Sequence, residues 1–260
     1  MKPYVRTTSI TKELVKTFTM RTPLLILTLL LAMSCTRPGM LTSEQVLEAS
    51  KSFHDPDQEW ENATLSLRIQ EPRIQNPTRY SNLLLNNADG SFSLDRNRDE
   101  HISTHIVSAE GEGSVLFNGS ADIDSQYVAA YRLSPERSLG YKGFYEFMYG
   151  LPMVITQESI KSMSPLNAAF FNDKACYQVE VELEKPLISS HWRLFFREGD
   201  FSMEGVEIFF PDELEKGEKI IFDDLAEIDG MKLPRIRNWY ELSNGEYSGS
   251  DIIVKEWVME

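Results

Sequence analysis

Hydrophobic positions recur with a period of two over most of the chain, a pattern typical of half-buried β-strands. In the first such stretch, Leu65, Leu67 and Ile69 alternate with polar residues. Further stretches with strand character cover residues 79–86, 101–107, 114–118, 177–183, 192–196, 206–210, 219–222, 235–242 and 251–257. Glycine-containing turn sequences separate many of them, and short turns join antiparallel neighbours. The second half of the chain is therefore predicted to be an antiparallel meander.

Three segments have helical character instead. Thr42 and Gln45 form a capping-box pair at the start of the first, which is expected to end shortly before Pro56. The other two are expected over residues 122–132 and 138–150, and the second of these is rich in aromatic residues at helical spacing. The pattern as a whole indicates an α+β protein, mainly antiparallel β, with a few helices packed on one face of a large sheet.

The N-terminal segment has a different composition. It contains several basic residues followed by the apolar run 24–33, which at about 1.5 Å per residue covers only half of a bilayer core of about 30 Å. This arrangement is typical of a secretory signal peptide, predicted over residues 1–34. Because Ser34 and Cys35 close the run, the segment resembles the lipobox of bacterial lipoproteins, although Ala32 stands where leucine is commonest. The resemblance implies cleavage between Ser34 and Cys35 and acylation of Cys35.

This processing would divide the chain into three parts. After the signal peptide, residues 35–42 are expected to be a lipidated tether, and residues 43–260 a single domain. Met20 would open a signal peptide of conventional length, so translation is expected to begin there, with no change to the cleavage site. Two or more acyl chains hold a protein stably at a bilayer. The predicted partner is therefore a membrane, contacted through the acyl chains.

Composition and charge limit the classes of partner. The formal net charge of the chain is −14, although the signal segment itself is basic. An acidic body repels phosphate backbones, so nucleic-acid binding is disfavoured. A hydrophobic content of 42% is that of an ordinary globular domain. If Cys35 is acylated, Cys176 has no intramolecular partner and the mature fold has no disulfide.

The sequence offers little catalytic chemistry. On a strand, His101 and His105 would lie about 13 Å apart at roughly 3.3 Å per residue, which disfavours a shared metal ion. The period of two places Cys176 on the same strand face as Gln178, Glu180 and Glu182, and an acidic neighbourhood raises the pKa of a thiol. No phosphate-binding loop, serine elbow or zinc-protease motif occurs. No catalytic residue, metal site or cofactor is predicted; a hydrolase would need His101, His191 or Cys176 beside a carboxylate in a cleft.

The informative feature is an excess of apolar residues on two strands. Trp192 and Phe195 fall on opposite faces of one strand, and Phe209 joins Glu207 on the polar face of the next. Strands of this kind are covered on both sides or line a groove. Two interpretations stay open: either the helix over residues 141–149 simply packs there, or the sheet forms a hollow for an apolar ligand. The residues expected to line such a hollow are Tyr141, Phe144, Tyr145, Met148, Tyr149, Trp192, Phe195, Phe209 and Trp239.

Several short motifs together resemble an uncharacterised lipoprotein family common in Bacteroidota. They are Phe-His-Asp-Pro at 53–56, Trp-Glu-Asn at 60–62, the stretch 141–153, Asp-Gly at 229–230, Leu-Pro-Arg at 233–235 and Trp-Tyr at 239–240. The resemblance covers residues 43–257 and is weakest over residues 96–126. That family looks similar in fold to the lipoprotein carriers LolA and LolB. The resemblance thus implies a curved, open half-barrel with helices on its concave face, over a hollow that accepts acyl chains.

The resulting hypothesis is a non-catalytic lipoprotein of the bacterial cell envelope that binds lipid or lipoprotein cargo. One alternative is an assembly lipoprotein that docks another envelope protein, and a second is a hydrolase. Thr36 follows the cysteine in place of the aspartate linked to inner-membrane retention, and no acidic run of the kind linked to surface display follows it. The periplasmic face of the outer membrane is therefore the expected location.

Overall fold

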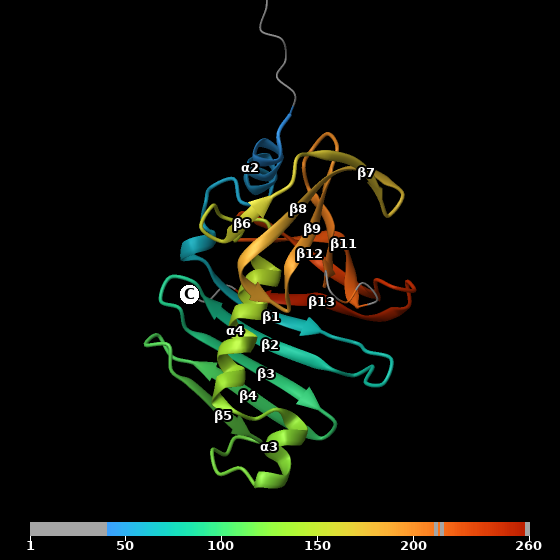
Figure 1. The fold of residues 1–260 in the computed structure, drawn as a ribbon. Coiled ribbons are helices and arrows are strands. Elements are labelled where there is room, and N and C mark those ends of the chain that lie inside the picture. The colour runs from blue at the N-terminus through green and yellow to red at the C-terminus, as the bar shows by residue number, and fades with distance from the viewer. Residues whose placement is uncertain (1–40, 211–212, 214–215, 258–260) are drawn as a thin grey trace, which may run out of the picture. The chain divides into compact units, whose positions relative to one another are not determined.

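The computed structural model describes residues 41–210, 213 and 216–257. Within these residues thirteen strands form one antiparallel sheet with the order β5-β4-β3-β2-β1-β13-β12-β11-β10-β9-β8-β6, and β7 pairs with β8 (Figure 1). The strands are β1 Thr64–Gln70, β2 Tyr80–Asn86, β3 Phe92–Arg98, β4 His101–Val107, β5 Gly113–Phe117, β6 Ile160–Met163, β7 Asn167–Phe171, β8 Lys174–Leu187, β9 Ser189–Arg197, β10 Met203–Phe209, β11 Gly217–Ile228, β12 Met231–Glu241 and β13 Tyr247–Trp257. The sheet is open, with β5 and β6 at its ends. The predicted class, an open and curved antiparallel half-barrel, is confirmed.

Within the described residues, three α-helices and one 3-10 turn accompany the sheet. They are α2 Ser43–His54, η1 Trp60–Asn62, α3 Ser125–Tyr131 and α4 Pro135–Gly150. The predicted capping box is present, because Thr42 Oγ1 accepts from the Gln45 backbone and the Gln45 side chain accepts from Thr42 N. Most strands lie where the period of two predicted them, whereas β3, β6 and β7 were not predicted.

The main core lies between α4 and the concave face of the sheet. α4 begins with a proline at its first turn, a position where the missing N–H costs nothing. Figure 1 shows the helix lying across β1 to β5. Its residues Tyr145, Met148 and Tyr149 are buried against inward-facing side chains of the sheet, among them Leu65 and Trp192. This packing fixes one side of α4 and leaves its first half to face the space beside the core.

The convex face has a smaller core of its own. The Phe171 ring, on β7, stacks on the Phe195 ring with a centroid distance of 4.0 Å, and Cys176 is buried with them. A Cβ on Gly205 would lie 2.2 Å from the Ile220 carbonyl oxygen and 2.6 Å from the Phe171 ring, so only glycine permits this approach. Covering by α4 on one face and by β7 on the other thus explains the apolar residues on both faces of β9.

The N-terminal expectations concern other residues. The signal peptide 1–34, the start at Met20, the cleavage site Ser34-Cys35 and most of the tether lie outside the described residues. Among the helices that are described, none combines the length and the apolar character needed to span a bilayer.

Candidate ligand-binding cavity

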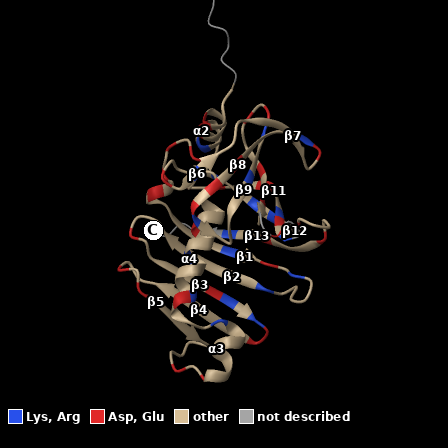
Figure 2. Ribbon diagram, viewed as in Figure 1, with Lys and Arg blue, Asp and Glu red and all other residues tan. Residues whose placement is uncertain are grey.

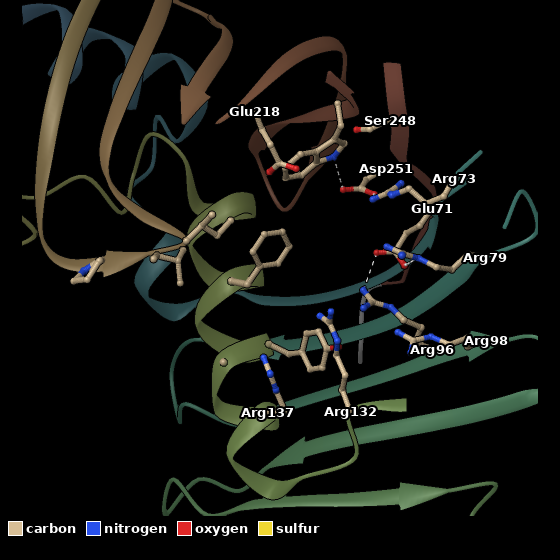
Figure 3. A pocket seen from close by; sticks show the side chains of 17 residues that line it. Glu71, Arg73, Arg79, Arg96, Arg98, Arg132, Arg137, Glu218, Ser248 and Asp251 are labelled. Atoms are coloured by element: carbon tan, nitrogen blue, oxygen red, sulfur yellow. Dashed lines mark hydrogen bonds and ion pairs between the residues drawn. The ribbon is translucent and has the colours of Figure 1, made fainter. Parts of the chain in front are cut away.

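A cavity of about 690 Å³ opens beside the first half of α4; it is called the α4 cavity below. Its walls come from the end of β1, from β3, the α3–α4 connection, α4, the β8–β9 turn and the strands β11 to β13 (Figure 3). Sites for small molecules measure about 300–1,000 Å³, so the volume is that of a ligand site.

One part of the wall is apolar. Tyr141 and Phe144 face the cavity from α4, Trp239 from β12, and Leu187 and Ile188 from the β8–β9 turn. The rings of Phe144 and Trp239 lie nearly parallel, with centroids 6.3 Å apart. Apolar side chains that line a concave site are what an acyl chain or another apolar group contacts.

The rest of the wall is unusually basic. Six arginines line the cavity, against three carboxylates, in a chain whose net charge is −14. Figure 2 shows Lys and Arg on the strands beside α4, between β13 and β3. The arginines are Arg73, Arg79, Arg96, Arg98, Arg132 and Arg137, and the carboxylates are Glu71, Glu218 and Asp251. Their partners separate them into two groups.

The first group is paired through Glu71. Its carboxylate accepts from Arg79 Nε at 3.1 Å, Arg96 Nη2 at 3.0 Å, Ser81 Oγ at 2.7 Å and Tyr145 Oη at 2.7 Å. Burial alone would raise the pKa of Glu71, but the charges of Arg96 and Arg79 and these hydrogen bonds lower it to about 2. Glu71 is therefore ionised throughout the physiological range, and the charges of Arg79 and Arg96 are compensated.

A second carboxylate positions the aromatic wall. Asp251 accepts from Arg73 Nη2 at 2.7 Å and from Trp239 Nε1 at 2.8 Å, which fixes the orientation of the indole ring. Burial and the negative charge of Glu71 raise the pKa of Asp251. Arg98 donates to the Ala130 carbonyl at 3.1 Å and is likewise engaged.

Arg132 and Arg137 differ from these. Both side chains are exposed, and neither has a hydrogen bond or an ion pair within the part of the chain that the structure describes. Figure 3 shows them on the α4 side of the cavity, across from Arg79, Arg96 and Arg98. Glu218 also lacks a partner among the described residues; burial and then Glu241 raise its pKa. In Figure 3 it lies at the far end of the cavity from the two arginines.

The structure separates the nine residues that were expected to line one hollow. Tyr141 and Phe144, both half-buried, line the α4 cavity together with Trp239, which is 6% exposed and belongs to the packed core as well; their contact with a ligand stays a prediction. The packed core contains four of the others, namely Tyr145, Met148, Tyr149 and Trp192. Phe195 and Phe209 are on the opposite face of the sheet, because side chains alternate along a strand; Phe209 packs there against Arg193. The expectation of a single hollow is corrected for these six.

His101, His105 and Cys176 do not line the cavity, although His105 packs on the Tyr141 ring beside it. His105 is buried, with Nδ1 3.1 Å from Ser138 Oγ; burial and the nearby charges of Arg96 and Arg98 lower its pKa to about 4. His101 packs on Phe117. Burial, then Glu204, raises the pKa of the Cys176 thiol, in the direction that the acidic neighbourhood predicted. The described residues contain no group of three or more potential metal ligands.

The arginine-rich wall was not predicted. Arg96 and Arg98 occupy alternate positions of β3, a strand whose polar end concealed its period. Arg73 and Arg79 lie in the loop between β1 and β2. The only local signal was the run Arg96-Asn97-Arg98, and because two acidic residues follow it directly, it does not stand out as a basic stripe.

Comparison with solved structures defines the class of the fold. The chain is similar to a LolA superfamily protein from Nitrosomonas europaea, with a TM-score of 0.52 and 10% identity over 85% of this chain and 94% of that one. A putative outer membrane lipoprotein-sorting protein domain from Vibrio parahaemolyticus matches with a TM-score of 0.46 and 11% identity, over 82% of this chain and 92% of that one. The first match shows a LolA-like fold, as the sequence resemblance implied.

The family itself follows from the sequence. The chain belongs to a family of unknown function (DUF6503), whose model matches residues 20–256. No curated protein matches it. The prediction of an uncharacterised family with a LolA-like half-barrel is confirmed, and a function has to be argued from the cavity.

Proposed function

We propose that this protein is a non-catalytic binding module of the bacterial cell envelope, anchored through acyl chains on Cys35. Its α4 cavity binds an amphiphile, such as a lipid or the acylated end of a lipoprotein. The observation that carries the proposal is a cavity of about 690 Å³ whose apolar wall includes Tyr141, Phe144 and Trp239.

The shape of the apolar wall supports an acyl chain as the bound group. Phe144 and Trp239 line the cavity from two different elements, and the hydrogen bond from Trp239 to Asp251 holds the indole ring in place without a ligand. A preformed apolar surface binds without the cost of ordering its side chains. The LolA-like fold, shared with a Nitrosomonas europaea protein that is itself described as a LolA superfamily member, is compatible with such a role.

A direct test measures binding of eight-carbon amphiphiles to the full-length protein. Solubilisation in an amphipathic polymer avoids free detergent that would compete for the cavity. The wild-type protein should bind octyl phosphate saturably, as measured by isothermal titration calorimetry. Phe144→Ala should weaken binding about tenfold, because an apolar contact of this size contributes about 1.5 kcal/mol or more.

The control is another phenylalanine. Phe170, on β7, is 83% exposed and does not line the cavity, so Phe170→Ala should leave the affinity unchanged. Absence of saturable binding of any octyl amphiphile to the wild-type protein would overturn the proposed function. Equal losses in both variants would show that the α4 cavity is not the site.

The anchor and the location need a separate test. Cys35→Ser removes the thiol that is expected to be acylated, and Cys176→Ser removes the buried cysteine and serves as its control. In cells, the first substitution should move the protein from the detergent phase to the aqueous phase, and the second should not. Fractionation should place the wild-type protein in the outer membrane, on its periplasmic face. An unchanged phase for Cys35→Ser would exclude the lipid anchor.

A further inference from the structure

The arginines of the α4 cavity outnumber the groups that neutralise them. Arg79 and Arg96 share Glu71, and Arg73 pairs with Asp251. These contacts use the two carboxylates on the strand side of the cavity. The guanidinium groups of Arg132 and Arg137 have no hydrogen-bond partner within the described part of the chain.

We propose that Arg132 and Arg137 form a subsite for the anionic head group, phosphate or carboxylate, of the bound amphiphile. This inference rests on the proposed function, since it assigns the chemical class of the ligand of that same cavity. The acyl chain would lie on the wall of Phe144 and Trp239, and the head group would contact the two guanidinium groups. The ligand is thus an anionic amphiphile rather than a neutral or cationic one.

The backbone holds both arginines in place before any ligand binds. Arg132 follows α3 in the left-handed conformation, with φ of 59°, and its N–H lies 3.4 Å from the Ala129 carbonyl. Arg137 lies in the first turn of α4, and its N–H donates to Ser134 O at 3.0 Å. Leu133, between them, is 3% exposed and packs in the small core under α3. Two fixed backbones with free side chains suit the planar, bidentate recognition of an oxyanion.

The electrostatic surroundings favour an anion at this end of the cavity. Two uncompensated cations repel one another, and a bound anion relieves that repulsion. Glu136 precedes Arg137 but does not line the cavity. Glu218, which has no partner among the described residues, lies at the opposite end from both arginines (Figure 3). A head group at Arg132 and Arg137 therefore lies far from the Glu218 carboxylate.

The test compares three probes on the full-length protein in the amphipathic polymer. Octyl phosphate has both the chain and the anion, octyltrimethylammonium has the same chain with a cation, and inorganic phosphate has the anion alone. The wild-type protein should bind octyl phosphate at least tenfold more tightly than either other probe. The affinity for octyl phosphate should fall as the salt concentration rises, because screening weakens exposed charge pairs.

The variant Arg132→Gln/Arg137→Gln should lose this tenfold preference and keep a weak affinity for both octyl probes. Its control is Arg68→Gln/Arg235→Gln, which removes the same charge from residues outside the cavity and should keep the preference. Circular dichroism checks that both variants are folded.

The outcomes separate the two proposals. If neither octyl probe binds the wild-type protein, the proposed function fails and the subsite fails with it. If both octyl probes bind equally and the double variant changes nothing, the function stands and the anionic subsite is overturned. If inorganic phosphate binds as tightly as octyl phosphate and only the cavity variant loses it, the subsite stands and its ligand is a free anion without a chain, which overturns the head-group assignment.

Discussion

The two sides of the α4 cavity use the same residue type in opposite ways. Arg79 and Arg96 point at Glu71 from the strand side, and Arg96 is 8% exposed. Arg132 and Arg137, on the helix side, are exposed and have no partner in the described chain. A guanidinium whose charge is compensated inside the protein contributes to the fold and has little left to offer a ligand. One that is uncompensated contributes little to the fold and remains available for binding.

If paired charges support the fold and unpaired ones do not, the largest loss of stability should follow substitution of Glu71. Glu71→Gln would leave the buried guanidinium of Arg96 without its carboxylate, and breaking a buried ion pair costs about 3–5 kcal/mol. We expect the free energy of unfolding to fall by that amount, as measured by urea denaturation followed by circular dichroism. The matched control is Glu218→Gln in the same cavity. Because burial penalises the ionised Glu218, its loss should change stability by less than about 0.5 kcal/mol or increase it. Similar losses for both variants would refute the distinction between paired and unpaired charges.

The ion pair between Glu71 and its arginines should also determine how stability depends on pH. The pKa of Glu71 is about 2 in the folded protein, against 4.5 for an unperturbed glutamate. Because the folded-state pKa is depressed, the ionised Glu71 contributes fully to the free energy of unfolding above pH 4.5, and this contribution is lost as the pH falls towards 2. The loss amounts to about 3 kcal/mol, since each pKa unit corresponds to about 1.4 kcal/mol. Urea midpoints measured from pH 6 to 2.5 should fall steeply in the wild-type protein. In Glu71→Gln the slope below pH 4.5 should be shallower, and an identical slope would exclude Glu71 as its cause.

His105 should add a separate step at higher pH. Its pKa is about 4 in the folded protein and 6.5 when unperturbed, because burial and the cavity arginines disfavour the imidazolium. The contribution of His105 to the free energy of unfolding is therefore fully present above pH 6.5. It is lost as the pH falls towards 4, because only the unfolded chain takes up this proton in that range. His105→Gln should flatten the profile in that window. A wild-type profile that is already flat between pH 6.5 and 4.5 would contradict the assignment.

Local pattern predicted the parts of the fold that depend on local chemistry. The capping box at Thr42 and the strand His101–Val107 could be read directly from the sequence, since each depends on neighbours in the chain. β3 could not, because Arg96 occupies an inward position where the period of two expects an apolar residue. Its burial depends on Glu71, 25 positions earlier, and on the Tyr145 hydroxyl, 49 positions later.

The cavity was beyond sequence reasoning for the same reason. The aromatic spacing of α4 indicated that its side chains face the sheet, and this was correct for Tyr145 and Tyr149. It could not indicate that Tyr141, one turn before Tyr145, and Phe144, directly before it, would face a space lined by arginines from β3 and from the loop after β1. Which face of a helix is packed and which borders a cavity depends on where the opposing strands end, and that is set by the whole sheet.

The smallest predicted change in stability concerns the two arginines on the helix side of the cavity, and it tests most directly whether the two sides differ in role. Removing both helix-side arginines in Arg132→Gln/Arg137→Gln should change the free energy of unfolding by less than about 0.5 kcal/mol without ligand, because exposed and unpaired side chains contribute little to stability. With octyl phosphate at about 100 times its dissociation constant, the wild-type protein should gain about 2.7 kcal/mol, since a ligand that binds only the folded state stabilises it by mass action. At the same ligand concentration the variant should gain less, by more than 1 kcal/mol. Thermal unfolding with and without ligand measures both quantities in one experiment. A variant that is unstable without ligand would mean that Arg132 and Arg137 support the fold as Arg96 does, and the two sides of the cavity would then not differ in role.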